Sequence, residues 1–168
     1  KTPLVRFLAE ILLGKGYKIA VLSRGYRRKR NDDIIFRSSP QTSLSAEDIG
    51  DEPMMLSLML EGVYFGIGAN RYKTGSGILK RFDPDIFLLD DGFQHRGMHR
   101  DLDIVVVDAR KPFDNGECLP AGMLREPSKN IKRAEIIIAK NFEDDSAFDK
   151  CKTAIDELGY DIPVLNGK

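Results

Sequence analysis

Short runs of consecutive apolar residues alternate along the chain with longer amphipathic segments. The runs predict strands at residues 19–22, 34–36, 63–67, 86–89, 104–107, 136–139 and 163–165. Apolar residues at helical spacing predict helices over about residues 3–13, 52–60, 70–81 and 146–158. Strands that are apolar throughout are typical of a parallel sheet covered on both faces. The pattern therefore predicts an α/β fold whose ligands bind at the carboxyl ends of the strands.

Two polar stretches interrupt this alternation. Residues 27–48 begin with the basic run Arg27–Arg30 and continue into a Ser-rich stretch, so we expect a long surface loop around one short strand. Residues 115–127 are punctuated by Gly and Pro and follow the strand at 104–107. Loops of this kind usually carry binding or motion.

Composition indicates a folded chain and names no partner. Hydrophobic residues make up 42% and charged residues 31% of 168 residues, which favours one globular domain over residues 1–168. Lys plus Arg and Asp plus Glu both number 26, so no overall charge draws the protein to nucleic acid, and we expect no nucleic-acid partner.

Neither the cysteines nor the apolar runs indicate zinc or a membrane span. Cys118 and Cys151 lack the spacing of a zinc site, so we expect reduced thiols. No apolar run approaches the roughly 18 to 20 residues that a membrane helix needs, and no secretory signal precedes the first helix. We expect the chain as given to be soluble.

Two places along the chain have the residues of a nucleotide site. Lys1-Thr2 directly precedes a helix, as in the last residues of the phosphate-binding motif G-x-x-x-x-G-K-[ST], although an arbitrary terminus would look the same. The strand at 86–89 runs into Asp90 and Asp91, where a P-loop enzyme places the carboxylate that holds Mg²⁺. Two solvated acids that cap a turn are the alternative for this pair.

Three further places have residues suited to phosphoryl transfer. Asp51 and Glu52 precede a proline and a predicted helix, so they could serve as a helix N-cap or as a general base. Arg24 lies just beyond a strand and could bind an anionic group, or could belong to an ordinary solvated basic loop. Arg125 could reach a transferring phosphoryl group as an arginine finger, or could be an ordinary surface arginine.

Taken in order, the segments KTP, SRGY, GDEP, GANR, LDDGFQHR, RDLDIVVVDA and LPAGMLREP resemble the tetraacyldisaccharide 4'-kinases of lipid A synthesis. The resemblance covers about residues 1–140 and implies a P-loop NTPase-like three-layer sandwich with a mainly parallel sheet. The family's loop glycines precede its Lys-Thr pair, and the family has an N-terminal membrane-associating segment and a C-terminal lobe. We therefore expect residues 1–168 to be a single core domain that begins inside the phosphate-binding loop. Met123 departs from the proline common at that position.

The resemblance also implies a role for individual residues, with ATP and Mg²⁺ as cofactors. It implies that Asp51 is the catalytic base, that Arg125 and His95 are catalytic, and that Asp91 is the preferred metal ligand. A structural role is the alternative for His95. The remaining implied residues are cofactor contacts at Lys1, Thr2 and Gln94, metal contacts at Thr2, Glu52 and Asp90, and substrate contacts at Arg24, Asn70 and Arg71.

The implied activity is transfer of the γ-phosphoryl group of ATP to the 4'-hydroxyl of a tetraacyldisaccharide 1-phosphate, at the cytoplasmic face of the bacterial inner membrane. A P-loop ATPase or GTPase that drives a conformational or metal-insertion step is one alternative, and AKNFED at 139–144 only partly resembles a guanine-reading motif. A noncatalytic Rossmann-like binding domain is another, but the chain has no G-x-G-x-x-G.

Overall fold

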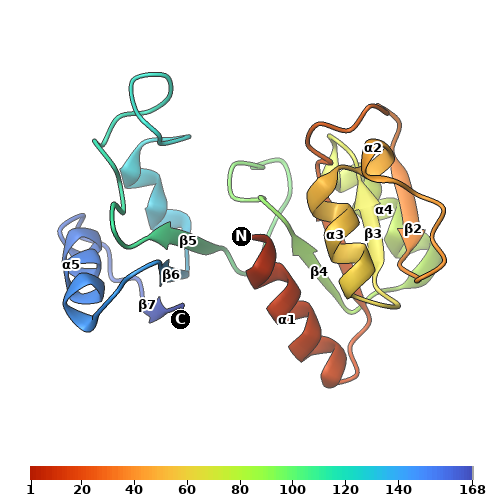
Figure 1. Ribbon diagram of the computed structural model, residues 1–168, viewed down its shortest axis with the longest axis horizontal. Helices are drawn as coiled ribbons and strands as arrows, with labels where there is room; N and C mark the ends of the chain where they lie inside the picture. Colours follow the sequence, from red (N-terminus) through yellow and green to blue (C-terminus); the bar gives the residue numbers. More distant parts are fainter. Residues whose placement is uncertain (168) are drawn as a thin grey trace. The chain divides into compact units, whose positions relative to one another are not determined.

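The computed structural model describes residues 1–167, which form two compact units, Lys1–Met98 and the residues from His99 onward. Figure 1 shows the first unit in red to green and the second in green to blue. The expectation that residues 1–168 form a single domain stays a prediction.

A 4-stranded sheet of order β2-β3-β1-β4 forms the centre of the first unit. Strands β1 (Ile19–Ser23), β3 (Tyr64–Ile67) and β4 (Ile86–Leu89) are parallel, with Leu22 opposite Leu89 in the register. Strand β2 (Ile34–Arg37) runs antiparallel to β3 at the edge. The predicted mainly parallel sheet is confirmed, as is the short strand within the polar stretch.

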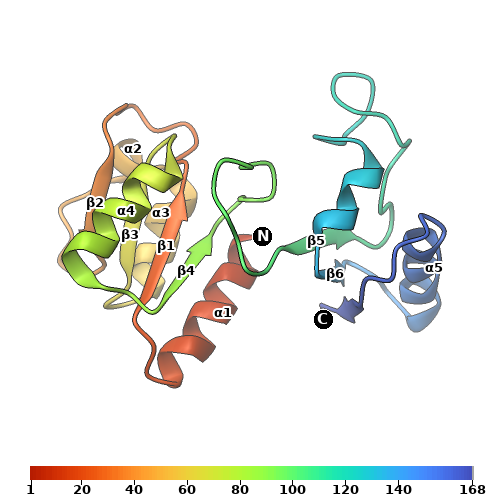
Figure 2. The same cartoon turned by 180° about the vertical axis from the view of Figure 1, so that it is seen from behind.

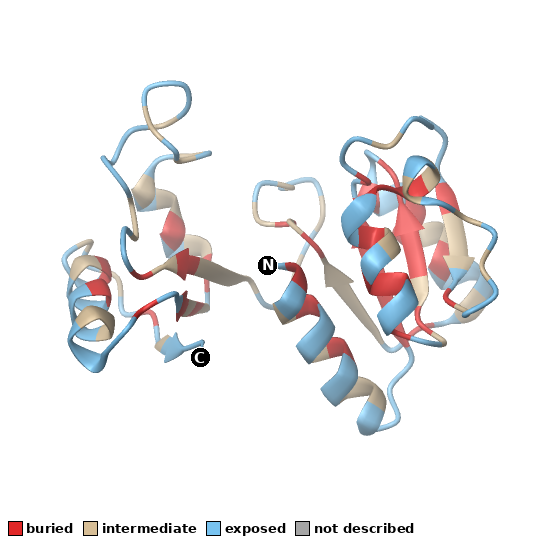
Figure 3. Cartoon of the chain, in the orientation of Figure 1, coloured by how far each residue is buried: buried red, intermediate tan, exposed pale blue. Residues whose placement is uncertain are grey.

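Helices cover both faces of this sheet. Helices α1 (Thr2–Gly14) and α3 (Asp51–Met59) lie on one face, and α4 (Arg71–Phe82) lies on the other, as Figures 1 and 2 show from opposite sides. Alternate residues of β1 serve the two faces, since Val21 packs with the α1 and α3 side chains and Leu22 packs with Ile78 of α4. The central strand is therefore buried throughout, in the three-layer arrangement that the resemblance implied (Figure 3).

The second unit is a smaller α/β layer. Strands β5 (Ile104–Asp108), β6 (Ile136–Lys140) and β7 (Val164–Asn166) form a parallel sheet in that order. Helix α5 (Asp145–Asp156) contributes the buried Cys151 and Ile155. A 3-10 helix, η1 (Ser128–Arg133), lies between β5 and β6 and buries Ile131.

The strand at 86–89 begins and ends where the sequence predicted, and the predicted helices agree with the structure to within about two residues. Two short elements were not predicted: α2 (Ala46–Ile49) and η1. Both are too short to show a helical period, although Ser45 and Asp48 form a capping box at the start of α2.

Candidate functional site

The candidate site lies at the edge of the first unit where the parallel strands end. Ser23, Ile67 and Leu89 are the last residues of β1, β3 and β4, so the segments that follow them leave the sheet on the same side. The backbone N–H of Asp90 continues the ladder by donating to the carbonyl of Leu22 at 2.9 Å. The structure therefore brings the segments beginning at Arg24, Gly68 and Asp90 to one edge.

Asp90 is a buried acid without a hydrogen-bond donor. Its side chain is 2% exposed, and neither carboxylate oxygen has a hydrogen-bond partner among residues 1–167. Burial, followed by the charges of Glu52 and Asp91, raises the pKa of Asp90 to about 6, while the charge of Lys1 opposes this rise. An unpaired, buried carboxylate is costly unless a cation approaches it, so this position suits a metal ion.

Asp91 is paired with the start of α1. The ammonium group of Lys1 donates a hydrogen bond to Asp91 Oδ1, which joins the first residue of the chain to the end of β4. The same bond brings the N-terminus of α1, the positive end of its backbone dipole, to this edge, and Thr2, the first residue of the helix, is 7% exposed there. Three residues that the sequence singled out, Lys1, Thr2 and Asp91, are thus brought together.

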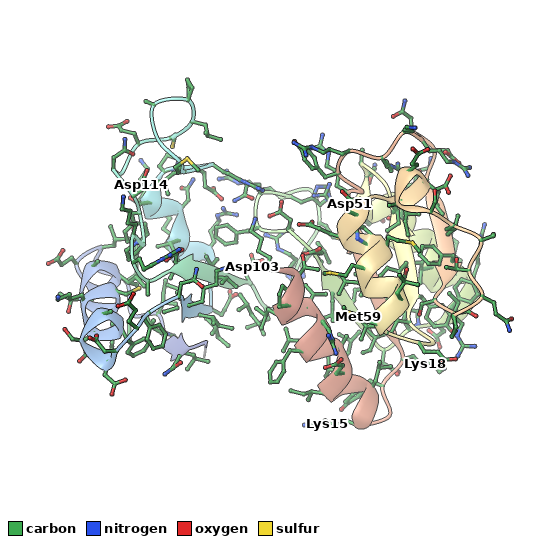
Figure 4. The ribbon with its side chains drawn as sticks, in the orientation of Figure 1. Lys15, Lys18, Asp51, Met59, Asp103 and Asp114 are labelled. Atoms are coloured by element: carbon green, nitrogen blue, oxygen red, sulfur yellow. The ribbon has the colours of Figure 1, made fainter. Side chains whose placement is uncertain are left out.

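Asp51 and Glu52 occupy the first turn of α3, and Figure 4 labels Asp51 there. The helix N-cap is Gly50, and no side chain caps it, so the interpretation of these acids as an N-cap is wrong. Both acids are exposed, and Glu52 is close enough to Asp90 to raise the pKa of that residue. They are available for chemistry because the helix does not need them for capping.

A close backbone approach fixes where α3 begins. Gly25 has φ +71°, and a Cβ at this position would lie 2.6 Å from Ile67 Cγ2 and 2.8 Å from the carbonyl oxygen of Ile49. Gly50 has φ +94° and would likewise meet the carbonyl oxygen of Tyr26 at 3.0 Å. Because only glycine fits these two positions, the segment after β1 lies directly against the start of α3.

Two arginines share this edge with Asp91. Arg71 is buried, and its Nη1 donates to the carbonyl of Ala69 at 3.1 Å, while its Nε has no hydrogen-bond partner in the described part of the chain. Burial, followed by repulsion from Arg24, lowers the pKa of Arg71, and attraction to Asp91 opposes this change. A buried guanidinium with an unused donor is well suited to receive an anion.

Asn70 has a structural task in addition to its predicted contact with substrate. It is the N-cap of α4, and its side-chain oxygen accepts a hydrogen bond from Lys73 N at 3.1 Å. Its amide nitrogen and the second lone pair of its oxygen are left for a ligand. The sequence prediction placed Asn70 inside the helix, one residue too early.

A hollow of about 480 Å³ lies beside this cap. It is lined by Ala69, Asn70, Tyr72, His95 and Gly97. His95 and Asn70, predicted separately, meet here, and Gln94 is exposed on the same loop. Tyr72, which is 62% exposed, was missed by the sequence analysis. An aromatic residue directly after the GANR segment was the signal that could have identified it.

Arg125 belongs to the second unit. It is exposed on the segment between β5 and η1 and is preceded by a loop with a cis peptide bond at Leu119-Pro120. Its predicted catalytic role therefore concerns a different unit from the acids of the first.

No group of three or more His, Cys, Asp or Glu side chains within residues 1–167 could hold a metal ion by itself. Likewise, no helix within these residues is long and apolar enough to cross a membrane.

Comparison with known proteins finds matches over almost the whole chain. Residues 1–165 match the family model of the tetraacyldisaccharide-1-P 4'-kinases (LpxK). The chain is 43% identical over 139 residues to the tetraacyldisaccharide 4'-kinase of Geobacter sulfurreducens, covering 82% of this chain and 39% of that protein. It is 38% identical over 165 residues to the same enzyme of Syntrophobacter fumaroxidans, covering 98% of this chain and 43% of that protein. The chain thus spans about two fifths of the length of these relatives.

The fold also matches a solved structure. The crystal structure of the apo form of LpxK from Aquifex aeolicus in complex with ATP superposes with a TM-score of 0.74 and 28% sequence identity. The match covers 98% of this chain and 65% of that one.

Proposed function

The chain belongs to the tetraacyldisaccharide-1-P 4'-kinase family, and we propose that the full-length protein transfers the γ-phosphoryl group of ATP to the 4'-hydroxyl of a tetraacyldisaccharide 1-phosphate. The observation that carries the proposal is the buried carboxylate of Asp90, which has no hydrogen-bond donor within residues 1–167 and stands beside the Lys1–Asp91 ion pair at the end of β4. An acid pair next to a lysine at a helix N-terminus is the arrangement with which P-loop enzymes bind a metal nucleotide.

The donor set fits Mg²⁺. This ion is usually held by one or two carboxylates together with phosphate oxygens and waters, so a cluster of three protein ligands is not required. Asp90 and Asp91 would hold the ion, with Glu52 and the hydroxyl of Thr2 nearby, and we keep Asp91 as the preferred ligand. Bound there, Mg²⁺ would neutralise charge on the phosphates.

Lys1 and Arg71 would supply the remaining positive charge. The ammonium group of Lys1 is held by Asp91, and a nucleotide phosphate competes for it at the same place. Arg71 is buried beside Asp91 with an unused Nε–H, so it can bind a phosphate without a large loss of side-chain freedom. Fixed donors of this kind stabilise the charge that develops on the transferred group.

Asp51 is the proposed general base. It is exposed on the first turn of α3, a position fixed by the close approach of Gly25 and Gly50, and the helix does not use it as a cap. The acceptor hydroxyl loses its proton as the new bond to phosphorus forms, and a carboxylate at hydrogen-bond distance can accept this proton.

The hollow beside Asn70 and His95 is the proposed substrate contact, together with Arg24. An imidazole, an amide and an exposed tyrosine ring offer polar and stacking contacts of the kind that suit a sugar. Four acyl chains hold such a substrate in a lipid bilayer. We therefore propose that the full-length protein works at a membrane surface, on the cytoplasmic face of the inner membrane, where ATP is available.

A direct assay tests the proposal. The full-length protein is incubated with Mg²⁺, ATP labelled in the γ-phosphoryl group and purified tetraacyldisaccharide 1-phosphate in detergent micelles. The expected product is the disaccharide with one added labelled phosphate at the 4'-position, identified by mass spectrometry. Release of inorganic phosphate without a lipid product would support the ATPase alternative instead. Absence of nucleotide binding would support the alternative of a noncatalytic binding domain.

A further inference from the structure

The residue after Arg125 is tied to η1 by a set of hydrogen bonds. Arg133 Nη2 donates to both carboxylate oxygens of Glu126 at 2.7 Å, and Asn130 Nδ2 donates to Glu126 Oε2 at 2.9 Å. The side chains of Arg133 and Glu126 are only 24% and 16% exposed. Hydrogen bonds between charged groups are shorter and stronger than neutral ones, and water screens this pair less than an exposed one. Glu126 is therefore held firmly.

The 3-10 helix that supplies both donors is itself anchored. Ile131 is 6% exposed and Ala134, directly after the helix, is 5% exposed. The backbone of η1 is thus fixed by packing in the interior of the second unit. The hydrogen bonds from Arg133 and Asn130 therefore hold Glu126 in a fixed position.

The segment before Arg125 is closed on itself. Leu119 N donates to the carbonyl of Leu124 at 2.9 Å, and Leu124 N donates to the carbonyl of Glu117 at 3.2 Å. Asn115 Nδ2 bridges the loop to the carbonyl of Ala121 at 3.0 Å. Gly122 is packed so closely that a Cβ would lie 2.3 Å from the carbonyl oxygen of Glu117. Leu124 consequently has a fixed position as well.

Arg125 is thus an exposed residue between two held neighbours. We propose that Arg133 and Asn130 are positioning residues, which act through Glu126 to fix the backbone of Arg125. The inference rests on the proposed function and on the arginine-finger role that the resemblance implies for Arg125. A long side chain reaches a reacting atom reproducibly only if its backbone is fixed, and a displacement of about 1 Å costs up to roughly 100-fold in rate.

The test compares two arginines in the full-length protein. Arg133→Met removes the hold on Glu126. Arg100→Met is the matched control, because Arg100 also makes two short hydrogen bonds to a carboxylate, that of Asp103, and this pair is 14% and 15% exposed. We expect Arg133→Met to lower kcat by about 10- to 100-fold with little change in KM for ATP. Arg100→Met should lower the melting temperature by a similar amount but leave kcat close to that of the wild type.

A double-mutant cycle distinguishes positioning from general stability. In an Arg125→Ala background the loss of kcat caused by Arg133→Met should disappear, because the group that it positions is gone. Arg133→Lys should keep part of the kcat that Arg133→Met loses. Asn130→Ala removes one hydrogen bond to Glu126 and should cause a smaller loss of kcat than Arg133→Met. It replaces Arg133→Met in the test if that variant does not fold.

Three results would overturn the inference. The first is an unchanged kcat in Arg133→Met, or in Asn130→Ala where that variant takes its place. The second is an equal loss of kcat from Arg133→Met in the Arg125→Ala background, and the third is an equal loss of kcat in Arg100→Met. A wild-type protein that forms no phosphorylated disaccharide would instead overturn the proposed function.

Discussion

Replacement of Asp90 by asparagine removes a charge that the first unit has to bury. The carboxyl group is 2% exposed and has no hydrogen-bond donor among the described residues, and its pKa rises from 3.8 to about 6. A shift of about two pH units corresponds to roughly 3 kcal/mol of stability that the ionised form costs the fold.

The sign of the pH dependence follows from which state holds the proton. Between pH 3.8 and about 6 the folded protein keeps the proton of Asp90 while the unfolded chain has lost it. Wild-type stability therefore falls as pH rises through this window and stays low above it. Asparagine does not titrate in this range, so any change in packing that the substitution causes has the same effect on stability at every pH. This constant effect cancels when the stability difference between the variant and the wild type is compared at two pH values.

The assay is urea denaturation of the full-length wild type and Asp90→Asn at pH 4 to 7, without nucleotide and with a chelator present. The free energy of unfolding of Asp90→Asn minus that of the wild type should rise by roughly 2.4 kcal/mol from pH 4 to pH 7, because part of the full effect is already present at pH 4. Carbon NMR of the Asp90 carboxyl group gives the pKa directly. A difference that does not change with pH would refute the reasoning.

Asp108→Asn is the control of opposite sign. Hydrogen bonds from Arg110 and Asn141 hold the pKa of Asp108 well below its usual range. The stability that this carboxylate contributes is present above its unfolded pKa of 3.8 and is lost below it. The variant should thus be less stable than the wild type at neutral pH, by an amount that shrinks in acid.

Three other predictions concern chemistry and the backbone. Asp51→Ala should lower kcat by roughly 100-fold or more with little change in KM for ATP, because a base acts in the transfer step; a collapse of ATP affinity at nearly normal kcat would assign Asp51 to binding. Asp91→Asn should shift the Mg²⁺ midpoint of the initial rate at saturating ATP and lower the maximum rate, whereas an unchanged midpoint and rate would transfer the metal role to Asp90 or Glu52. Gly25→Ala should destabilise the first unit by well over the roughly 1 kcal/mol expected of Gly16→Ala. Both glycines have positive φ, but a Cβ at Gly25 would lie 2.8 Å from a backbone oxygen, whereas one at Gly16 would meet nothing within 4 Å. Equal melting temperatures of the two variants would contradict this.

The sequence by itself determined the elements and the fold class. A strand that is buried on both faces must be apolar at nearly every position, and a helix that covers a sheet must be apolar at every third or fourth. Strand β1 and helix α4 could therefore be recognised from composition and period alone. The phosphate-binding and acidic segments were also identifiable, because their residue types at strand and helix ends carry the chemistry. Short elements such as α2 and η1 were missed because four to six residues complete barely one to two turns.

Tertiary structure decided which of these residues meet and in what state. Strand periodicity does not specify direction, so only the sheet shows that β2 is antiparallel. The raised pKa of Asp90 depends on burial and on Glu52, a residue 38 positions earlier in the sequence, and the lowered pKa of Arg71 depends on Arg24. The hydrogen bonds from Arg133 to Glu126 likewise form only because η1 brings the two side chains together. Desolvation and pairwise charge interactions depend on distances in space, which a local pattern of apolar and polar residues does not contain.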